Sequence, residues 1–334
     1  MESVKTIKVR AGVLEGADSL VRELGGNPAE VARQIGASRR LLANPDAPIP
    51  VAWVIAYLQQ AAHYCACPHF GLLLGPRQSL DLFGALAPLL ESATTLGELV
   101  RDIAAYFPLH TRGALVSLVA EEDGIAVCYD AVAGIGESQR QLIELGLAIL
   151  ATELRRHAPD WQPEIILLRH SAPQDLAPYA RIMGCLPQFN ADRNALYLPA
   201  NLLVRPTLSG DPAVHGSLEA RFDQARRSQA EAVVTRAEIV VRALLPFAPC
   251  DLAATARMMR SSRRTLQRKL ASQHDSFEKV VDRVRADLAL SYLKDSDLSV
   301  AEIAEILQFS ETSALSRACR RWYGSSPRGL RSAA

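Results

Sequence analysis

Four basic side chains and one amide side chain lie within the short stretch 262–270. The basic residues are Arg263, Arg264, Arg268 and Lys269. Such side chains can neutralise phosphates, and Gln267 can form paired hydrogen bonds with a base edge. Sequence-specific DNA binding needs both contacts, because phosphate contacts position a protein and base contacts specify its site. A solvated basic surface is the alternative interpretation of such a run.

Apolar spacing predicts that this stretch is a helix packed against another short helix. The preceding segment carries an apolar stripe formed by Leu252, Ala253, Ala256 and Met259. Asp251 can cap that first helix, and Ser262, after Ser261 in the turn, can cap the second. The buried side of the second helix would hold Leu266 and Leu270. Two short helices with facing apolar stripes and a tight connection form a helix-turn-helix unit.

A second unit of this kind is predicted at 299–323. Ser299 and Glu302 have the spacing of a capping box. The apolar face behind it is formed by Val300, Ile303, Ala304 and Leu307. The segment Ser310-Glu311-Thr312-Ser313 is expected to cap a further helix. That helix carries Leu315, Arg317, Ala318, Arg320, Arg321 and Trp322.

A longer helix is predicted between the two units, over residues 277–293. Its apolar stripe is formed by Val280, Val281, Val284, Leu288 and Leu293. A rigid spacer suits DNA, because adjacent major grooves on one face repeat at about 34 Å. The charges divide the chain near the same region: residues 235–334 contain 17 Lys+Arg and 11 Asp+Glu, a net charge of +6. Residues 1–234 contain 20 and 25, a net charge of −5, which together with +6 gives the overall +1.

Four side chains that could bind a soft metal lie between residues 63 and 69, namely His63, Cys65, Cys67 and His69. Such a group could hold zinc, and a thiol pair could sense oxidants. The spacing argues against a shared site, because ligands at every second position point around a helix, and Pro68 ends the helix there. Buried cysteines at a helix end are the expected alternative, and no metal or other cofactor is predicted.

Motifs typical of catalysis are missing from the sequence. It contains no Gly-x-Ser-x-Gly pattern, no phosphate-binding glycine loop and no His-Glu-x-x-His pattern. The acidic run 121–123 precedes Gly124 and is better explained as a hairpin turn. We therefore predict that the protein is not an enzyme. The alternative from that class is a self-modifying cysteine sensor fused to a DNA-binding part, which would use Cys65 or Cys67.

The first two hundred residues predict an α+β domain with helices on a small, largely antiparallel sheet. The predicted helices cover residues 11–36 as a pair, 50–64, 82–106 with a division at 92–95, and 138–157. The predicted strands cover residues 114–119, 125–129, 164–169 and 194–198. Pro28 is expected in the first turn of a helix, Thr95 as a cap, and Pro199 before a helical turn.

Composition excludes several classes of protein. With 334 residues, 49% of them apolar, the chain is long enough for two or three domains. Its polar start lacks the apolar segment of a secretory signal, and no apolar run approaches the roughly 18 residues of a membrane helix. Six scattered cysteines do not form a disulfide framework. We expect a protein of a reducing cytoplasm with no membrane partner.

The C-terminal hundred or so residues resemble the AraC/XylS transcription regulators. In the first unit the match consists of Ala256 and Ser262-x-Arg264-Thr265-Leu266-Gln267-Arg268-x-Leu270. In the second unit it consists of Ile303-Ala304, Phe309-Ser310 and Ser313-x-x-Ser316-Arg317-Ala318-x-Arg320-Arg321-Trp322-x-Gly324-x-Ser326-Pro327-x-x-Leu330-Arg331. The resemblance implies an all-α DNA-binding domain with two helix-turn-helix units joined by a long helix.

The sequence departs from the family pattern at four positions. Arg260 and Gln308 stand where the turns usually carry glycine, and Leu315 and Cys319 stand where phenylalanine is common. A side chain at a turn position with positive φ costs on the order of 1 kcal/mol, and the other two replacements keep their positions apolar. These departures put in question how firmly the second unit is held.

The N-terminal part more loosely resembles the arabinose-binding-type domain of regulators similar to those of ornithine use and of mycobacterial virulence. The match consists of Phe70-Gly71-Leu72 and Phe189-Asn190-Ala191-Asp192-Arg193-Asn194-Ala195-Leu196-Tyr197-Leu198-Pro199. It implies a domain that binds an effector, although no ligand residues can be transferred. An apolar cavity is expected among the helices of residues 50–110. Its possible walls include Tyr57, Phe83, Tyr106 and Phe107.

We therefore predict a regulatory domain over residues 1–210, a linker over 211–234 and a DNA-binding domain over 235–334. The expected DNA contacts are Ser262, Arg263, Arg264, Gln267, Arg268, Ser310, Thr312, Ser313, Ser316, Arg317, Arg320 and Arg321. The expected function is transcriptional activation in response to a small-molecule effector. The expected partners are double-stranded promoter DNA, RNA polymerase, the effector and a second copy of the chain. A regulator whose N-terminal domain only dimerises is the alternative.

Overall fold

The computed structural model describes residues 8–37, 42, 44–111, 113–131, 139–228, 233–246, 250–259 and 261–332. Two compact units divide the chain. The first unit consists of Met1–Leu168, Ala172–Phe189 and Asn194–Asp223, and the second of Arg169–Ser171, Asn190–Arg193 and Gln224–Ala334. Helix α11 (Pro212–Ser228) lies within the stretch expected as a linker and begins in the first unit. Arg260, which stands where the first turn usually carries glycine, lies outside the described residues.

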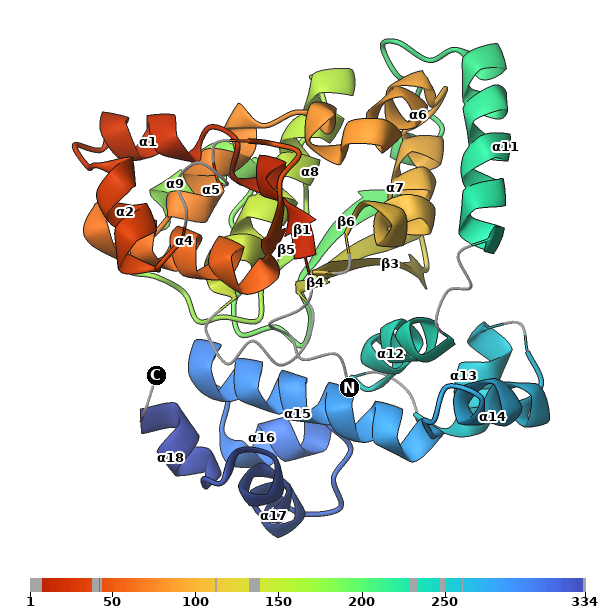
Figure 1. The fold of residues 1–334 in the computed structure, drawn as a ribbon. Coiled ribbons are helices and arrows are strands. Elements are labelled where there is room, and N and C mark those ends of the chain that lie inside the picture. Colours follow the sequence, from red (N-terminus) through yellow and green to blue (C-terminus); the bar gives the residue numbers. More distant parts are fainter. Residues whose placement is uncertain are drawn as a thin grey trace. The chain divides into compact units, whose positions relative to one another are not determined.

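The first unit contains many short helices, as the helical spacing of its apolar residues predicts (Figure 1). Its α-helices are α1 (Ala17–Glu23), α2 (Pro28–Gln34), α4 (Val51–Tyr64), α5 (Phe70–Leu74), α6 (Ala87–Ser92), α7 (Leu96–His110), α8 (Arg140–His157), α9 (Ala177–Met183) and α10 (Ala200–Leu203). Its 3-10 helices are η2 (Ala11–Leu14), η3 (Gly75–Arg77) and η4 (Leu80–Leu86). Asn27 caps α2 and Thr95 caps α7 through side-chain hydrogen bonds, and Pro199 is the N-cap residue of α10.

Two antiparallel sheets complete the first unit. The larger sheet has the order β3-β4-β6-β5 and consists of β3 (Ala114–Glu121), β4 (Gly124–Ala131), β6 (Ala195–Pro199) and β5 (Ile166–Leu167). The smaller sheet pairs β1 (Lys8–Arg10) with β2 (Pro48–Pro50) and was not predicted. The strand expected over 164–169 is shorter than predicted, because only two of its residues pair with β6.

The acidic run 121–123 lies in the β3–β4 hairpin, as predicted, with Glu121 opposite Gly124. Gly124 is needed for a reason other than turn geometry. A Cβ atom there would lie 2.1 Å from the carbonyl oxygen of Leu198 on β6, so a side chain would push the two strands apart. The sheet packs against α7 and α8, which form much of the apolar core of this unit.

Helix α5 lies unusually close to α8 because two glycines, Gly71 and Gly75, face it. A Cβ atom on Gly71 would lie 2.0 Å from the carbonyl oxygen of Gln141, and one on Gly75 would lie 2.5 Å from the Cβ of Ala148. Gln141 also accepts a hydrogen bond from the amide of Gly71 through its side chain, at 2.7 Å. The short spacing between the glycines therefore fixes how closely these two helices pack.

We expect Gly71→Ala to lower the free energy of unfolding of the first unit by about 1–3 kcal/mol, because backbone must move to admit the methyl group. Gly216→Ala is the matched control, since nothing lies within 4 Å of a Cβ atom there. Thermal unfolding followed by circular dichroism measures both. Equal stability of the two variants would show that α5 and α8 separate at no cost.

The second unit contains helices in the order that the sequence predicts. They are α12 (Val233–Leu244), α13 (Leu252–Met258), α14 (Arg263–Ala271), α15 (Phe277–Asp295), α16 (Val300–Ile306), α17 (Thr312–Tyr323) and α18 (Pro327–Ser332). One apolar core runs through this unit and includes Leu266, Val284, Leu288, Ile303 and Leu315. The expected fold class, an α+β domain followed by an all-α domain, is confirmed. Among the described residues, no helix combines the length and apolarity needed to span a membrane.

Candidate nucleic-acid interface and ligand cavity

The first helix-turn-helix unit consists of α13 and α14. Asp251 caps α13 by accepting a hydrogen bond from the amide of Ala254 at 2.7 Å, and Ser262 caps α14 by accepting one from Thr265 at 3.1 Å. Leu266 and Leu270 are fully buried, as predicted from their spacing. The predicted caps and apolar stripe therefore orient α14.

Burial of the leucines leaves the polar side of α14 facing solvent. The exposed residues are Ser262, Arg263, Arg264, Gln267, Arg268 and Lys269. In the described part of the chain, no carboxylate lies within ion-pair distance of the three arginines. These cations and the Gln267 amide are therefore available to an anionic partner with readable hydrogen-bonding groups, which is what the DNA major groove presents.

The second helix-turn-helix unit consists of α16 and α17. Ser299 and Glu302 form the predicted capping box. The N-cap of α17 lies within the predicted segment 310–313, at Glu311, but the side-chain capping bond expected there is not formed. The Ser313 hydroxyl instead donates to the Glu311 carboxylate, so this side chain is drawn away from the amides of the first turn.

Most of the predicted DNA contacts of the second helix-turn-helix unit are exposed, namely Ser310, Thr312, Ser313, Arg317, Arg320 and Arg321. Ser316 is half-buried. Two of the arginines already have partners. Arg317 forms an ion pair with Glu311 at 3.3 Å, and Arg321 forms one with Asp282. Trp322 is half-buried, as expected from packing, and donates to Asp282 at 2.9 Å. Among the described residues, the second helix-turn-helix unit therefore offers fewer arginines without an ion-pair partner than the first helix-turn-helix unit.

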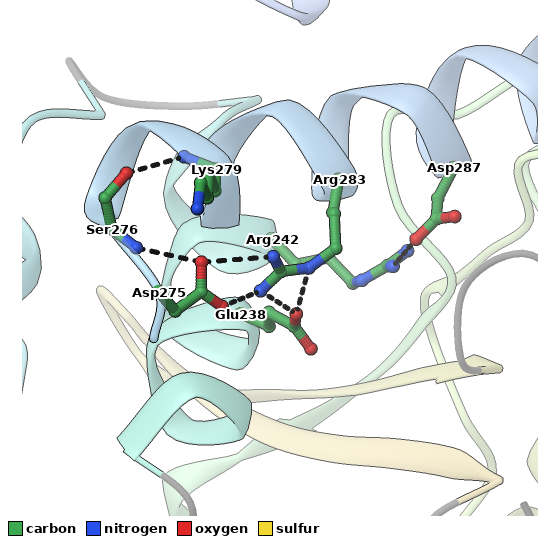
Figure 2. A network of polar contacts seen from close by, with 7 residues as sticks. All are labelled: Glu238, Arg242, Asp275, Ser276, Lys279, Arg283 and Asp287. Atoms are coloured by element: carbon green, nitrogen blue, oxygen red, sulfur yellow. Dashed lines mark hydrogen bonds and ion pairs between the residues drawn. The ribbon is translucent and has the colours of Figure 1, made fainter. Parts of the chain in front are cut away.

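An ion-pair network joins α12 to the loop after α14 and to α15 (Figure 2). Arg283 contacts Glu238 on α12 and Asp275 in the loop, each at 2.8 Å. Burial acts most strongly on the Asp275 carboxyl and raises its pKa, but the hydrogen bonds from Arg283 and the Ser276 amide, together with the charges of Arg283 and Lys279, outweigh burial, so the pKa lies below its ordinary value. Arg242 pairs with Asp287 at 2.8 Å, with side chains only 8% and 10% exposed. The network fixes α12 and the loop after α14 to α15.

Gln308 connects the turn of the second helix-turn-helix unit to the segment that leads into the first helix-turn-helix unit. Its φ of 54° confirms the left-handed geometry that favours glycine at this position. Its side chain donates to the carbonyl of Leu245 at 2.7 Å and accepts from the amide of Cys250 at 3.1 Å. Its own carbonyl accepts from Arg285 at 2.8 Å. Nothing in the sequence pattern indicated this role, because it depends on partners about sixty residues away.

The two other departures from the family pattern fit the core. Leu315 and Cys319 are both fully buried within the apolar core of the second unit. Burial raises the pKa of the Cys319 thiol to about 11, so the thiol stays neutral and behaves as a small apolar group. These departures put in question how firmly the second helix-turn-helix unit is held. Core packing of Leu315 and Cys319 and the hydrogen bonds of Gln308 hold it in place.

The structure does not bring the soft-ligand side chains of residues 63–69 together. Within the described ranges, no group of three or more His, Cys, Asp or Glu side chains could hold a metal ion. Cys65 and Cys67 are half-buried free thiols, and burial raises the pKa of each. His69 is buried and packs edge-on against Tyr179. This surrounding favours the thiol over the thiolate that metal binding and nucleophilic attack require.

A cavity of about 90 Å³ lies inside the first unit, between the β3–β4 hairpin, α7 and α8. Phe83 and Phe107 line it, as expected. The expectation for Tyr57 and Tyr106 is wrong: the Tyr57 hydroxyl donates to Asp18 at 2.8 Å and the Tyr106 hydroxyl to Asp223 at 3.1 Å. His110 lines the cavity as well, and no motif in the sequence pointed to it.

Comparison with known proteins agrees with this architecture. Residues 25–207 match the family described as "Arabinose-binding domain of AraC transcription regulator, N-term", and residues 255–333 match a helix-turn-helix domain family. A transcriptional regulator of Mycobacterium tuberculosis, VirS, is 28% identical over 97% of this chain and 96% of its own length. The ornithine utilization regulator of Pseudomonas aeruginosa is 28% identical over 84% of this chain and 82% of its own.

Among solved structures, the transcriptional regulator CdpR of Pseudomonas aeruginosa is 22% identical, with a TM-score of 0.43 over 91% of this chain and 96% of its own. The family matches cover both halves of the chain, and the second falls on the two helix-turn-helix units described above. Similar regulators align with nearly all of the sequence. The protein therefore belongs to the AraC/XylS family of transcription regulators, and it is not an enzyme.

Proposed function

We propose that this regulator binds double-stranded promoter DNA with α14 as its main reader and α17 as its second reader. The observation that carries this proposal is the exposed face of α14, where Arg263, Gln267 and Arg268 stand beside buried Leu266. Arg263, Gln267 and Arg268 supply base or groove contacts, and Arg264 contacts phosphate. Ser310, just before α17, and Thr312, Ser313, Ser316 and Arg317 on α17 approach the DNA, and Arg320 and Arg321 lie nearer its backbone.

Replacing Gln267 with alanine is expected to relax specificity at one base pair by about 1–3 kcal/mol and to leave the salt dependence of binding nearly unchanged. The reason is that an amide reads a base without neutralising a phosphate. Binding sites selected from random DNA and salt titrations measure both quantities. Gln273→Ala is the matched control, because Gln273 is exposed just beyond α14. An unchanged site preference in Gln267→Ala would remove this residue from the readout.

We further propose that a small-molecule effector binds in the first unit and changes DNA affinity. The cavity supports this, since ligand sites are concave, largely apolar and few in number. Coupling between two sites is reciprocal, so DNA must alter effector affinity by the same factor. The resemblance to the family favours an activator that contacts RNA polymerase, and in vitro transcription with purified polymerase tests this role. Because it acts on promoters, we place the protein in the bacterial cytoplasm.

A first unit that only dimerises is the second candidate. Its support is the exposure of three apolar side chains, Val204, Leu208 and Val214, which are 74%, 71% and 45% exposed. Burying such side chains in a symmetric interface is favourable. Analytical ultracentrifugation of a Val204→Asp/Leu208→Asp variant tests the dimer. An effector that shifts DNA affinity without changing the oligomeric state would favour the first candidate.

A further inference from the structure

The cavity in the first unit is lined almost wholly by hydrocarbon. Its walls come from β1, η2, α4, η4, α7, β3, β4 and α8, and they include Val54, Leu82, Val116, Val127 and Leu145. Protein interiors are close-packed, and their empty spaces are rarely larger than a water molecule. A cavity of about 90 Å³ walled by aliphatic side chains is therefore a defined departure from ordinary packing.

One lining side chain offers an unused hydrogen bond. The Nδ1 atom of His110 is buried and has no partner within the described structure. The ring is held in place by Phe83 and Phe107, with centroids 4.9 and 5.8 Å away. Burial, helped by the charge of Arg10, lowers the pKa of His110 to about 4. The imidazole is therefore neutral near pH 7, with one nitrogen that donates and one that accepts.

The remaining polar groups of the wall do not favour a charged guest. No lysine or arginine lines the cavity among the described residues. Glu153 also lines it, but its carboxylate already accepts from Arg156 at 2.5 Å and contacts His157 at 3.1 Å. Thr111 and Tyr129 line it too. The Thr111 hydroxyl already accepts from the Gly113 amide at 2.9 Å, and burial raises the pKa of the Tyr129 phenol, so both groups stay uncharged. Moving an ionised group from water into such surroundings without a counter-charge is strongly unfavourable, and each hydroxyl of a polyol that finds no hydrogen-bond partner adds a further penalty.

We infer that the cavity binds an uncharged, mainly hydrocarbon molecule that carries one hydrogen-bonding group placed against His110. This inference rests on the proposed effector function of the first unit and gives its ligand a chemical class. A sugar or an amino acid does not suit the site, because its polar groups outnumber the partners on the wall. The volume limits the guest, since a dry cavity of about 150 Å³ accommodates benzene.

Three four-carbon compounds test the class: 1-butanol, butanoate and erythritol. They share a carbon skeleton and differ in charge and in the number of hydroxyls. Titration of each into the full chain at pH 7, followed by the methyl NMR signals of Val116 and Val127, reports binding directly. We expect saturable binding of 1-butanol only. Equal or tighter binding of butanoate or erythritol would overturn the class, and no saturable binding of any compound would overturn the site.

Two variants locate the binding. Ala114→Leu fills the cavity from β3 and is expected to abolish 1-butanol binding, whereas Ala105→Leu on α7, which does not line the cavity, leaves it unchanged. His110→Phe keeps an aromatic ring and removes the hydrogen bond, so affinity should fall about fivefold, as expected for about 1 kcal/mol. Unaltered affinity in Ala114→Leu would place the compound elsewhere, and circular dichroism shows whether each variant is folded.

The same samples separate this inference from the proposed function. DNA binding by the wild-type chain is measured with and without 1-butanol. Saturable binding in the cavity with no change of DNA affinity would support the ligand class and count against the coupling. DNA binding without any cavity binding would leave the DNA-reading proposal intact and overturn the ligand class.

Discussion

Replacing Arg242 with methionine is expected to lower the free energy of unfolding of the second unit by about 3–5 kcal/mol. Arg242 and Asp287 are paired at 2.8 Å with side chains only 8% and 10% exposed. Arg242→Met takes the guanidinium away from the buried Asp287 carboxylate, and the penalty of burying that carboxylate without it exceeds the attraction lost. The effect would be large against a typical total stability of about 5–15 kcal/mol.

Trp322 makes this measurement specific to the second unit, because the other two tryptophans, Trp53 and Trp161, lie in the first. In a background with Trp53→Phe and Trp161→Phe, urea unfolding followed by fluorescence reports the second unit. The double variant Arg242→Met/Asp287→Leu should recover most of the loss, since neither charge remains.

An exposed ion pair supplies the control for this prediction. Arg317 and Glu311 are 68% and 58% exposed, so solvent screens the pair and Glu311→Gln should destabilise the second unit far less than Arg242→Met. Similar losses for Arg242→Met and Glu311→Gln would show that burial does not amplify the loss of the Arg242–Asp287 pair. Arg242→Met should also weaken DNA binding only as far as the second unit unfolds, because Arg242 is not a predicted contact.

Features set by neighbours in the sequence were predictable. Asp251, Ser262 and Ser299 cap the helices that their positions indicated, because a capping bond joins residues two or three apart. The spacer helix α15 buries the stripe that its periodicity predicted. The same reasoning failed at residues 310–313, where several capping residues compete and the choice depends on side-chain hydrogen bonds that local pattern does not determine.

Features set by distant residues were not predictable. The pairing of β1 with β2 joins Val9 to Ile49, and neither segment alternates for long enough to indicate a strand. The cavity needs residues from eight elements, so the sequence could suggest aromatic candidates but could not separate Phe83, which lines it, from Tyr57, which does not. Gln308 looked like a defect because its pattern position favours glycine, while its compensating partners lie far along the chain.

Replacing Gln308 with alanine is expected to lower the free energy of unfolding of the second unit by about 2–3 kcal/mol. Alanine keeps the Cβ atom, and therefore the strain at a φ of 54°, but removes both side-chain hydrogen bonds. Glycine also removes the bonds but relieves the strain, by on the order of 1 kcal/mol. Gln308→Gly should therefore be more stable than Gln308→Ala and less stable than the wild type.

The order of stability of the wild type, Gln308→Gly and Gln308→Ala separates the effect of backbone strain from that of the two Gln308 side-chain hydrogen bonds. DNA binding then tests what these hydrogen bonds contribute to function. Without these hydrogen bonds, the turn of the second helix-turn-helix unit is no longer bonded to Leu245 and Cys250, which precede the first helix-turn-helix unit. We expect affinity for a DNA site that engages both α14 and α17 to fall by roughly tenfold, since fixed spacing raises the effective concentration of the second contact. Affinity for a half-site read by α14 alone should not change. A Gln308→Gly variant that is as stable as the wild type and binds the DNA site for both α14 and α17 with full affinity would contradict this role. It would mean that the glycine of the family pattern holds the two helix-turn-helix units together equally well.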